Sequence, residues 1–283
     1  MNATRRWVLA PTARAADAVY QQLIWLGRLL LFALEVMISL PVTAVRYRKE
    51  VWRLIAEVTF GGGLLAVAAS TVLVATLLSA VIGIQLGLEG LQGLDILGLA
   101  PLAGLLAAFG NTRELSPLIV AFGLAAQMGC RFTAQLGAMR VTEEIDALEV
   151  MSTPSLQYLV CTRMIAVLIT VIPLYLLALA GAYIGSEVSV LVVAHQGTGT
   201  YNHYFHLFLN AGDVYYSILK VVVLAVMITF IHCYYGFNAT GGPEGVGQAA
   251  GRAIRASVVL IAVADLLMTM LFWGISSGIK VSG

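Results

Sequence analysis

The chain has 283 residues, of which 60% are hydrophobic and 11% are charged, and its formal net charge is +1. Soluble domains carry about 25% charged residues, so the composition excludes an ordinary soluble protein and predicts an all-α integral membrane protein. The net charge gives no information about partners, and we expect no nucleic acid among them. The three cysteines, Cys130, Cys161 and Cys233, are scattered through apolar segments, which predicts free thiols rather than disulfides or a metal site.

Residues 1–20 contain three arginines but no apolar core of signal-peptide length. We therefore expect a cytoplasmic tail, followed by one membrane domain over residues 21–283. Residues 21–45 are apolar but include Arg28 and Glu35, which are seven apart and share one helical face. This pattern favours an interfacial (elbow) helix lying along the membrane surface. A helix that crosses the membrane here is the open alternative.

Five further segments are apolar over the ~20 residues that a helix needs to cross a bilayer. They cover about residues 58–86, 115–136, 159–184, 214–237 and 253–274. Between the first two, Gly87 to Asn111 is rich in glycine and moderately apolar, which predicts an amphipathic or re-entrant segment on the outer side. Residues 238–255 predict a glycine-rich cytoplasmic loop before the last span.

The basic residues predict how these spans are oriented. They lie in or beside the segments assigned to the cytoplasm: Arg5, Arg6, Arg14, Arg46, Arg48, Lys49, Arg53, Arg140, Arg163, Arg252 and Arg255. The long loop over residues 187–212 has neither lysine nor arginine. Because cytoplasmic loops are enriched in basic residues, we expect the N-terminus in the cytoplasm and, after five spans, the C-terminus outside the plasma membrane.

The stretch from Arg113 to Met151 enters the membrane, crosses it and leaves on a short acidic helix. Arg113 and Glu114 stand side by side just before the apolar run. Glycine and alanine recur through the span, a pattern that lets helices pack closely where lipid supplies no hydrophobic drive. The charged pair has either a functional role or only anchors the helix among the lipid headgroups.

The acidic helix follows this span directly. Its charged and large apolar residues are Val141, Glu143, Glu144, Ile145, Asp146 and Leu148, and Pro154 is expected to end it. The three apolar residues fall at positions i, i+4 and i+7, a stripe that needs a partner to cover it. We therefore predict a docking element for a cytoplasmic partner, with an ordinary solvated loop as the alternative.

Charges inside the predicted spans are few, and each is a candidate functional residue. Lys220 lies about two turns into the fourth span, and Asp265 lies at the middle of the fifth. At a rise of ~1.5 Å per residue, their depths differ by only a few ångströms, so we predict that they pair. We favour a structural clamp between helices over a proton relay, because a relay would need more than one carboxylate at that depth.

The motifs of an enzyme are missing from the sequence. Its lysines are Lys49, Lys220 and Lys280, and none follows a glycine, as a phosphate-binding loop requires. No His-Glu-x-x-His motif is present either. The outer loop contains His195, His203 and His206, but no carboxylate or thiol lies between the last two, which favours an interfacial aromatic belt over a metal site.

Several segments together resemble one family of membrane proteins. They are RELSP, LGAMRVTEEIDALEVM, the exit at Pro154 and Arg163, YYGFNATGGPEGVGQAAGRAIRAS and the buried Asp265. In order and spacing they are similar to the MlaE/YrbE permeases, the membrane subunits of ABC transporters that work with MCE proteins to move lipids. The likeness runs from about Arg46 to Trp273, and the runs HCYYGF and TYNHYF look closest to actinobacterial YrbE proteins of the B type.

The resemblance implies a five-span permease with an N-terminal interfacial helix, used as two copies beneath an MCE assembly. A separate cytoplasmic ATPase dimer would drive it and hold the ATP and Mg, so we expect no cofactor in this chain. Val141 to Leu148 would be the coupling helix seated on the ATPase, and Arg113 and Glu114 would lie near the outer mouth of the lipid cavity. The cargo would be a fatty acid, sterol or phospholipid, moved across or out of the plasma membrane, with import as the expected direction.

The chain departs from the family pattern at two positions. Many members have arginine where this chain has Gln127, and glutamate where it has Gln135. The loss of both charges fits a heterodimer with a paralogous permease, and a homodimer is the alternative. Two other functions stay open: a proton-coupled secondary transporter that uses Asp265, and a non-transporting scaffold for MCE proteins. The first would show an inverted repeat, and the sequence has none that we recognise.

Overall fold

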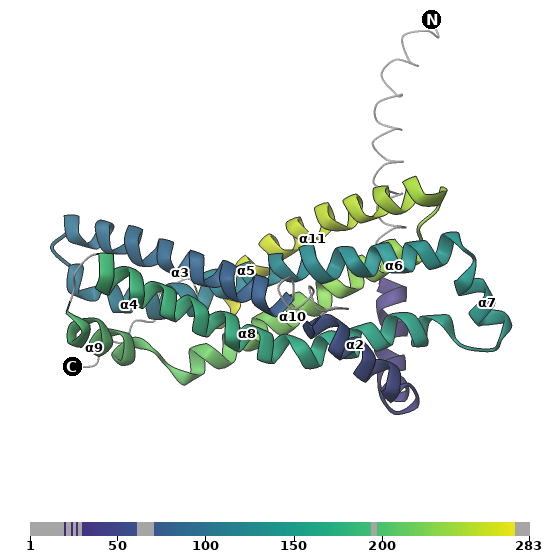
Figure 1. Cartoon of the computed structure of the whole chain (residues 1–283), viewed down its shortest axis with the longest axis horizontal. Coiled ribbons are helices and arrows are strands. Elements are labelled where there is room, and N and C mark those ends of the chain that lie inside the picture. The colour runs from purple at the N-terminus through teal and green to yellow at the C-terminus, as the bar shows by residue number, and fades with distance from the viewer. Residues whose placement is uncertain are drawn as a thin grey trace, which may run out of the picture.

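The computed structural model describes residues 20, 24, 27, 30–60, 71–193 and 197–274, and these fold into an elongated bundle of helices (Figure 1). The helices are α2 (Arg48–Phe60), α3 (Thr71–Ile96), α4 (Ala103–Gly110), α5 (Ser116–Leu124), α6 (Cys130–Val141), α7 (Glu144–Val150), α8 (Thr162–Val188), α9 (Thr198–Phe208), α10 (Ala211–Phe237) and α11 (Gly242–Trp273). Short turns join them: a 3₁₀ turn η2 (Ala100–Leu102) and π-helical turns η3 (Asn111–Leu115), η4 (Ala125–Gly129), η5 (Leu156–Cys161) and η6 (Ser189–Val193).

The expected five-span, all-α membrane fold is confirmed. Within the described residues, five helical stretches are long and apolar enough to cross a bilayer: Thr71–Ile96, Ala100–Val141, Leu156–Val192, Ala211–Phe237 and Gly242–Trp273. They occur in the expected order. The start of the expected first span falls partly on residues 61–70, which lie outside the described residues.

Two segments differ from the sequence-based expectation. The amphipathic or re-entrant segment expected over residues 87–111 is instead the end of α3 followed by a helical stretch that runs from Ala100 to Val141. At ~1.5 Å per residue, those 42 residues reach about 63 Å, twice the ~30 Å of hydrocarbon, so the bundle extends beyond the membrane. The glycine-rich loop expected over 238–255 is helical from Gly242 on, because the left-handed Gly241 (φ 93°) ends the turn and Pro243 suits a first helical turn.

The N-terminal helix, Leu30–Arg46, lies crosswise to the long axis of the bundle in Figure 1. It meets the helix that begins at Arg48 at an angle of 101°. Seven of its large apolar side chains are more than half exposed: Leu30, Leu31, Leu34, Met37, Ile38, Val42 and Val45. A crosswise helix with an exposed apolar face has the features of a helix that lies in the membrane interface. The bent pair Leu30–Arg46 and Arg48–Thr59 is also long and apolar enough to form one broken span, so the alternative of a sixth crossing stays open.

The main core lies between α5, α6, α8, α10 and α11, and side chains such as Leu136, Leu174 and Leu224 are fully buried there. The most extensive helix contact among the described residues is between α3 and α8, where a Cβ atom added at Gly83 would overlap the backbone carbonyl of Ala182. Small residues of this kind allow backbones to approach closely within a membrane.

The segment with the histidines contains a helix, α9. α9 packs on α4, and its residue Tyr201 is buried in this contact with its ring stacked on Phe205. Burial away from water raises the pKa of Tyr201. His195 lies outside the described residues, and among those described no group of three His, Cys, Asp or Glu side chains could hold a metal ion.

Candidate functional site: a buried charge cluster and an acidic end helix

Lys220 is the centre of a charge cluster that joins three spans. Its side chain, on α10, is fully buried. The ammonium donates hydrogen bonds to Arg113 O (2.9 Å), Glu114 Oε2 (3.2 Å) and Thr269 Oγ1 (2.7 Å), which uses the three donors that a lysine has. Asp265 Oδ1 lies 2.8 Å from Nζ as a fourth neighbour. The ammonium therefore connects η3, α10 and α11.

The carboxylate of Asp265 is held by charge more than by hydrogen bonds. Its side chain is 7% exposed, and its Oδ1 atom accepts no hydrogen bond within the described residues although Lys220 Nζ is close. A buried carboxylate without a nearby cation would be very unfavourable. Asp265 consequently depends on Lys220 as its nearby cation.

Local backbone structure explains why Lys220 reaches the Arg113 carbonyl. Pro117 stands four residues after Arg113 and has no N–H to donate to that carbonyl. Arg113 and Glu114 themselves lie in the π-helical turn η3, a geometry that often marks functional positions. The acceptor that the proline leaves free is taken by Lys220, because a buried carbonyl needs a partner.

Arg113 points to a second part of the cluster, which the sequence did not predict. Its guanidinium Nη2 lies 2.9 Å from Asp213 Oδ2, and Trp273 Nε1 donates to Asp213 Oδ1 at 2.6 Å. The guanidinium carbon also lies 4.1 Å from the ring centroid of Phe109 and 5.3 Å from that of Trp273. The first turn of α10 and the last turn of α11 are thus tied to η3. The signal in the sequence was Asp213 itself, a carboxylate at the start of the fourth span.

The acidic end helix α7 lies at the opposite end of the bundle from α9 (Figure 1). Ile145 is fully buried in the main core, Leu148 packs against that core, and Val141 is half-buried at the end of α6. The apolar stripe is therefore covered by the chain itself, and the expectation that it needs a partner is wrong. The α7 helix is anchored to its own bundle by that stripe.

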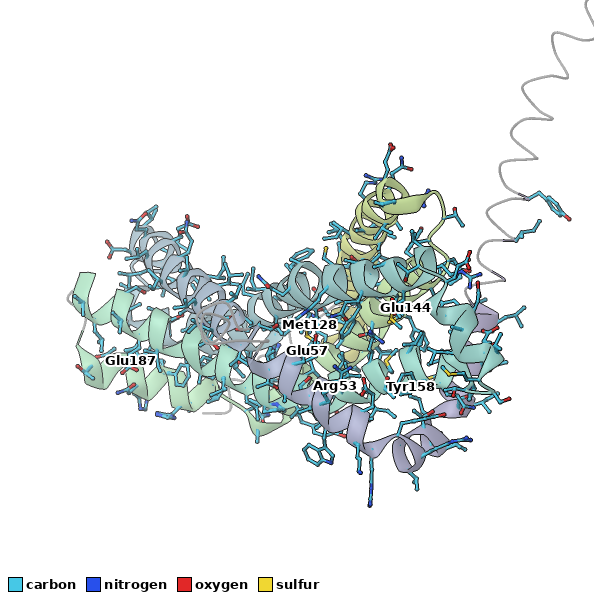
Figure 2. All side chains as sticks on the ribbon, turned by 45° about the vertical axis from the view of Figure 1, so that its right-hand side comes forward. Arg53, Glu57, Met128, Glu144, Tyr158 and Glu187 are labelled. Atoms are coloured by element: carbon cyan, nitrogen blue, oxygen red, sulfur yellow. The ribbon has the colours of Figure 1, made fainter. Side chains whose placement is uncertain are left out.

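The surface of α7 that remains free is acidic. Glu143, Glu144 and Asp146 are exposed, as are the large apolar side chains Val150 and Met151 just after them. Asp146 Oδ1 accepts a hydrogen bond from Arg140 Nη1 (2.6 Å), and Glu144 Oε1 accepts one from Thr142 Oγ1 (3.0 Å). Figure 2 shows Glu144 at this end and Glu187 at the other. Glu143 adopts a left-handed backbone (φ 61°), unusual for a residue other than glycine, and so makes the sharp turn from α6 into α7.

A further polar cluster ties α2 to α6 and α8 near Glu57, which Figure 2 labels. Glu57 Oε1 accepts from Gln135 Nε2 (3.0 Å) and lies 3.5 Å from Arg131 Nη2. Gln135 Oε1 in turn accepts from the buried Arg163 (3.3 Å), whereas Gln127 is exposed. The sequence signal for Arg131 was its charge inside the predicted span 115–136.

Comparisons with known proteins agree on one family. The family model of the permease MlaE matches residues 61–271. A probable ABC transporter permease protein of Rickettsia prowazekii is 35% identical over 163 residues, which are 57% of this chain and 62% of that protein. A probable ABC transporter permease protein of Synechocystis is 31% identical over 167 residues, with the same two shares.

A plant protein is also similar. The chloroplastic protein TRIGALACTOSYLDIACYLGLYCEROL 1 of Arabidopsis thaliana is 30% identical over 200 residues, 71% of this chain and 57% of that protein. In each of these three comparisons the chain covers less than two thirds of the relative's length.

Proposed function

Because the chain belongs to the MlaE permease family, we propose that it is the membrane-spanning, non-catalytic subunit of an ABC transporter that moves lipids. ATP would be hydrolysed by a separate ATPase dimer, which would hold ATP and Mg. In this proposal the α7 end of the bundle faces the cytoplasm and the α9 end faces outward, as the basic residues predict.

The observation that carries the proposal is the way α7 is built. It is a short helix between two spans, anchored by the fully buried Ile145 and exposed on its acidic side. A partner that binds Glu143, Glu144 and Asp146 therefore contacts an element that packs on α6 and is fixed to the main core by Ile145. Such an attachment is suited to pass a movement of the ATPase into the membrane spans. The acidic side favours a basic groove on that ATPase.

The charge cluster supports a pathway for a polar headgroup. The Glu114 side chain is 43% exposed although it contacts the fully buried Lys220, so it is the member of the ion-paired group that a cargo can reach. We propose that Arg113 and Glu114 border the lipid pathway and that Lys220 and Asp265 clamp the helices behind them. The name of the plant relative, which contains trigalactosyldiacylglycerol, supports a lipid cargo.

A second permease subunit is supported by polar side chains on the outside of a span. Arg131 and Gln127 are exposed, although both lie within the apolar stretch Ala100–Val141. Polar side chains facing lipid are costly, so a protein neighbour or an aqueous cavity suits this face better. We propose a paralogous permease as that neighbour, with MCE proteins at the α9 end and import as the direction.

The test is a pull-down of this subunit from its native membranes. Wild type should bring down an ATPase, a second permease and MCE proteins. Glu144→Lys and Asp146→Lys should lose only the ATPase, because they reverse charges on the free side of α7. Glu244→Lys, at an exposed carboxylate near the start of α11, is the matched control and should keep every partner. Isolation of wild type without an ATPase would contradict the proposal.

A further inference from the structure

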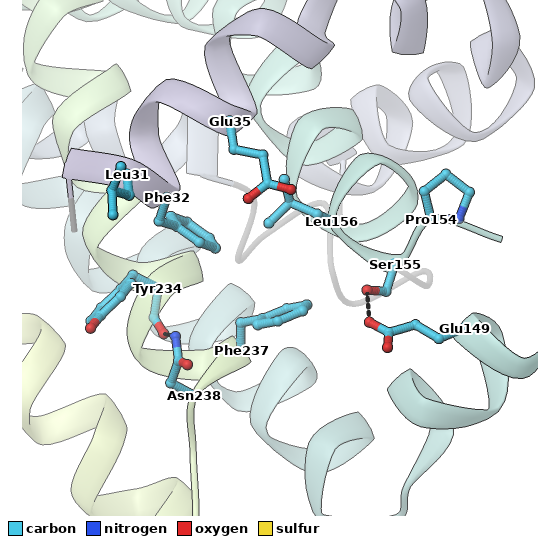
Figure 3. Close-up of a pocket in the computed structure, with 10 residues that line it drawn as sticks. All are labelled: Leu31, Phe32, Glu35, Glu149, Pro154, Ser155, Leu156, Tyr234, Phe237 and Asn238. Carbon is cyan, nitrogen blue, oxygen red and sulfur yellow. Dashed lines mark hydrogen bonds between the residues drawn. The ribbon is translucent and has the colours of Figure 1, made fainter. Parts of the chain in front are cut away.

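A cavity of about 780 Å³ lies at the α7 end of the bundle, apart from the charge cluster (Figure 3). The N-terminal helix forms one wall, the end of α7 and the start of η5 form a second, and the end of α10 forms a third. The lining residues are Leu31, Phe32, Glu35, Glu149, Pro154, Ser155, Leu156, Tyr234, Phe237 and Asn238. The volume falls within the ~300–1,000 Å³ that is usual for small-molecule sites.

The lining combines carboxylates with aromatic rings, and its described residues include no lysine, arginine or histidine. Glu35 is exposed and makes no hydrogen bond or ion pair within the described part of the chain. Glu149 accepts one hydrogen bond, from Ser155 Oγ at 2.6 Å, which Figure 3 shows. Neither carboxylate is therefore neutralised by a described residue.

The aromatic side chains that line the cavity contact one another. The Phe32 ring lies edge-on to Tyr234 with the centroids 5.5 Å apart, and Phe237 lies 6.2 Å from Phe32. Aromatic faces attract cations, and carboxylates bind them strongly. The chemistry of the described lining thus suits a cation, and none of these residues offers a cationic side chain to an isolated phosphate.

The surroundings of the cavity indicate where that cation comes from. Leu31 both lines the cavity and is 69% exposed, and Leu34 on the next turn is 59% exposed. These residues belong to the crosswise helix with the apolar face, so the mouth of the cavity opens beside a surface that suits acyl chains. A side chain from another protein would leave most of this volume empty, whereas a lipid can place its headgroup inside and its acyl chains on the apolar face.

We propose that this cavity binds the primary ammonium headgroup of a lipid in the leaflet at the α7 end. The ammonium would lie between Glu35 and Glu149 and over the rings of Phe32, Tyr234 and Phe237. A primary ammonium donates three hydrogen bonds and so satisfies both carboxylates, while a quaternary ammonium donates none. The site therefore prefers an ethanolamine headgroup to a choline headgroup. The inference requires the membrane location of the chain and not its transport function.

The experiment uses the complex purified from native membranes and placed in nanodiscs that contain phosphatidylethanolamine or phosphatidylcholine. A water-soluble carbodiimide activates carboxylates, and a primary amine in contact then forms an amide as the urea leaves. We expect phosphatidylethanolamine adducts at Glu35 or Glu149, mapped by peptide mass spectrometry. Glu244, an exposed carboxylate near the start of α11, is the internal control and should be modified at the background level.

A second measurement does not depend on the covalent reaction. Native mass spectrometry should show phosphatidylethanolamine retained over phosphatidylcholine. The double variant Glu35→Gln/Glu149→Gln should reduce that retention about tenfold or more, since one charge-assisted hydrogen bond is worth at least that factor. Glu244→Gln should leave it unchanged. Equal retention of the two lipids by wild type, or unchanged retention by the double variant, would overturn the proposal. Carbodiimide cross-links from Glu35 or Glu149 to a protein lysine would do so as well, because the occupant would then be a partner side chain.

Discussion

Replacing Lys220 with methionine removes the ammonium at the centre of the charge cluster and keeps an unbranched side chain of similar length. The change deletes three hydrogen bonds and the contact with Asp265 at 2.8 Å. Two carboxylates then lose their cation. Glu114 is 43% exposed and can turn toward water, but Asp265 is 7% exposed and cannot.

The magnitude follows from that buried carboxylate. Removing one partner of a buried ion pair costs about 3–5 kcal/mol in the free energy of unfolding. Insertion scales give about 2.5–3.5 kcal/mol for a lone charge at the centre of a membrane helix. Both ranges include about 3 kcal/mol, which we expect for Lys220→Met. Asp265→Leu should cost less, about 1–3 kcal/mol, because Lys220 keeps Glu114 and Thr269 as partners.

The assay is equilibrium unfolding of both single variants and the double variant in the same micelles. The double variant should be more stable, by about 1–3 kcal/mol, than the sum of the two single changes in unfolding free energy implies. The reason is that substitutions at residues in contact do not have additive effects. The reasoning would be refuted by a double variant that is additive within about 0.5 kcal/mol, or by Asp265→Leu costing more than Lys220→Met.

Three other predictions rest on single contacts. Ile145→Ala should lower the unfolding free energy by about 2–5 kcal/mol, because the side chain is fully buried. An unchanged stability would contradict this burial and indicate that a partner covers the apolar stripe. Gly129→Ala should cost about 1–3 kcal/mol in the same assay, since a Cβ atom there would lie 2.6 Å from the His232 ring, and an unchanged stability would contradict this packing. Asp213→Asn should cost about 1–3 kcal/mol by removing the carboxylate that binds Arg113; a loss below about 0.5 kcal/mol would count against that ion pair.

The five spans were predictable because a bilayer demands long apolar helices, and length and hydropathy are visible in the sequence. The helical turns that extend these spans beyond their apolar segments were not predictable. The polar first half of α11, around Glu244 and Arg252, has the composition of a loop, yet it is helical and buries Gly245 and Ala249 in one line with the apolar half. Packing against other helices decided the structure there, and composition does not report it.

The candidate site was predictable only in part. Opposite charges at similar depth in two spans pointed to Lys220 and Asp265 as neighbours. Their contact with Glu114 was not predictable, because it depends on how η3 faces α10 and on the carbonyl that Pro117 leaves without a donor. The stripe that contains Ile145 was correctly recognised as apolar, but periodicity cannot tell whether a stripe faces a partner or its own core.

The most direct test of the account is lipid movement by the purified complex in proteoliposomes, measured with ATP, without ATP, and with a protonophore. An ABC-type permease predicts that movement stops without ATP, survives the protonophore, and is lost in Glu144→Lys when the ATPase no longer binds. Movement that continues without ATP and collapses with the protonophore would contradict the account, and would identify a secondary transporter that uses Asp265.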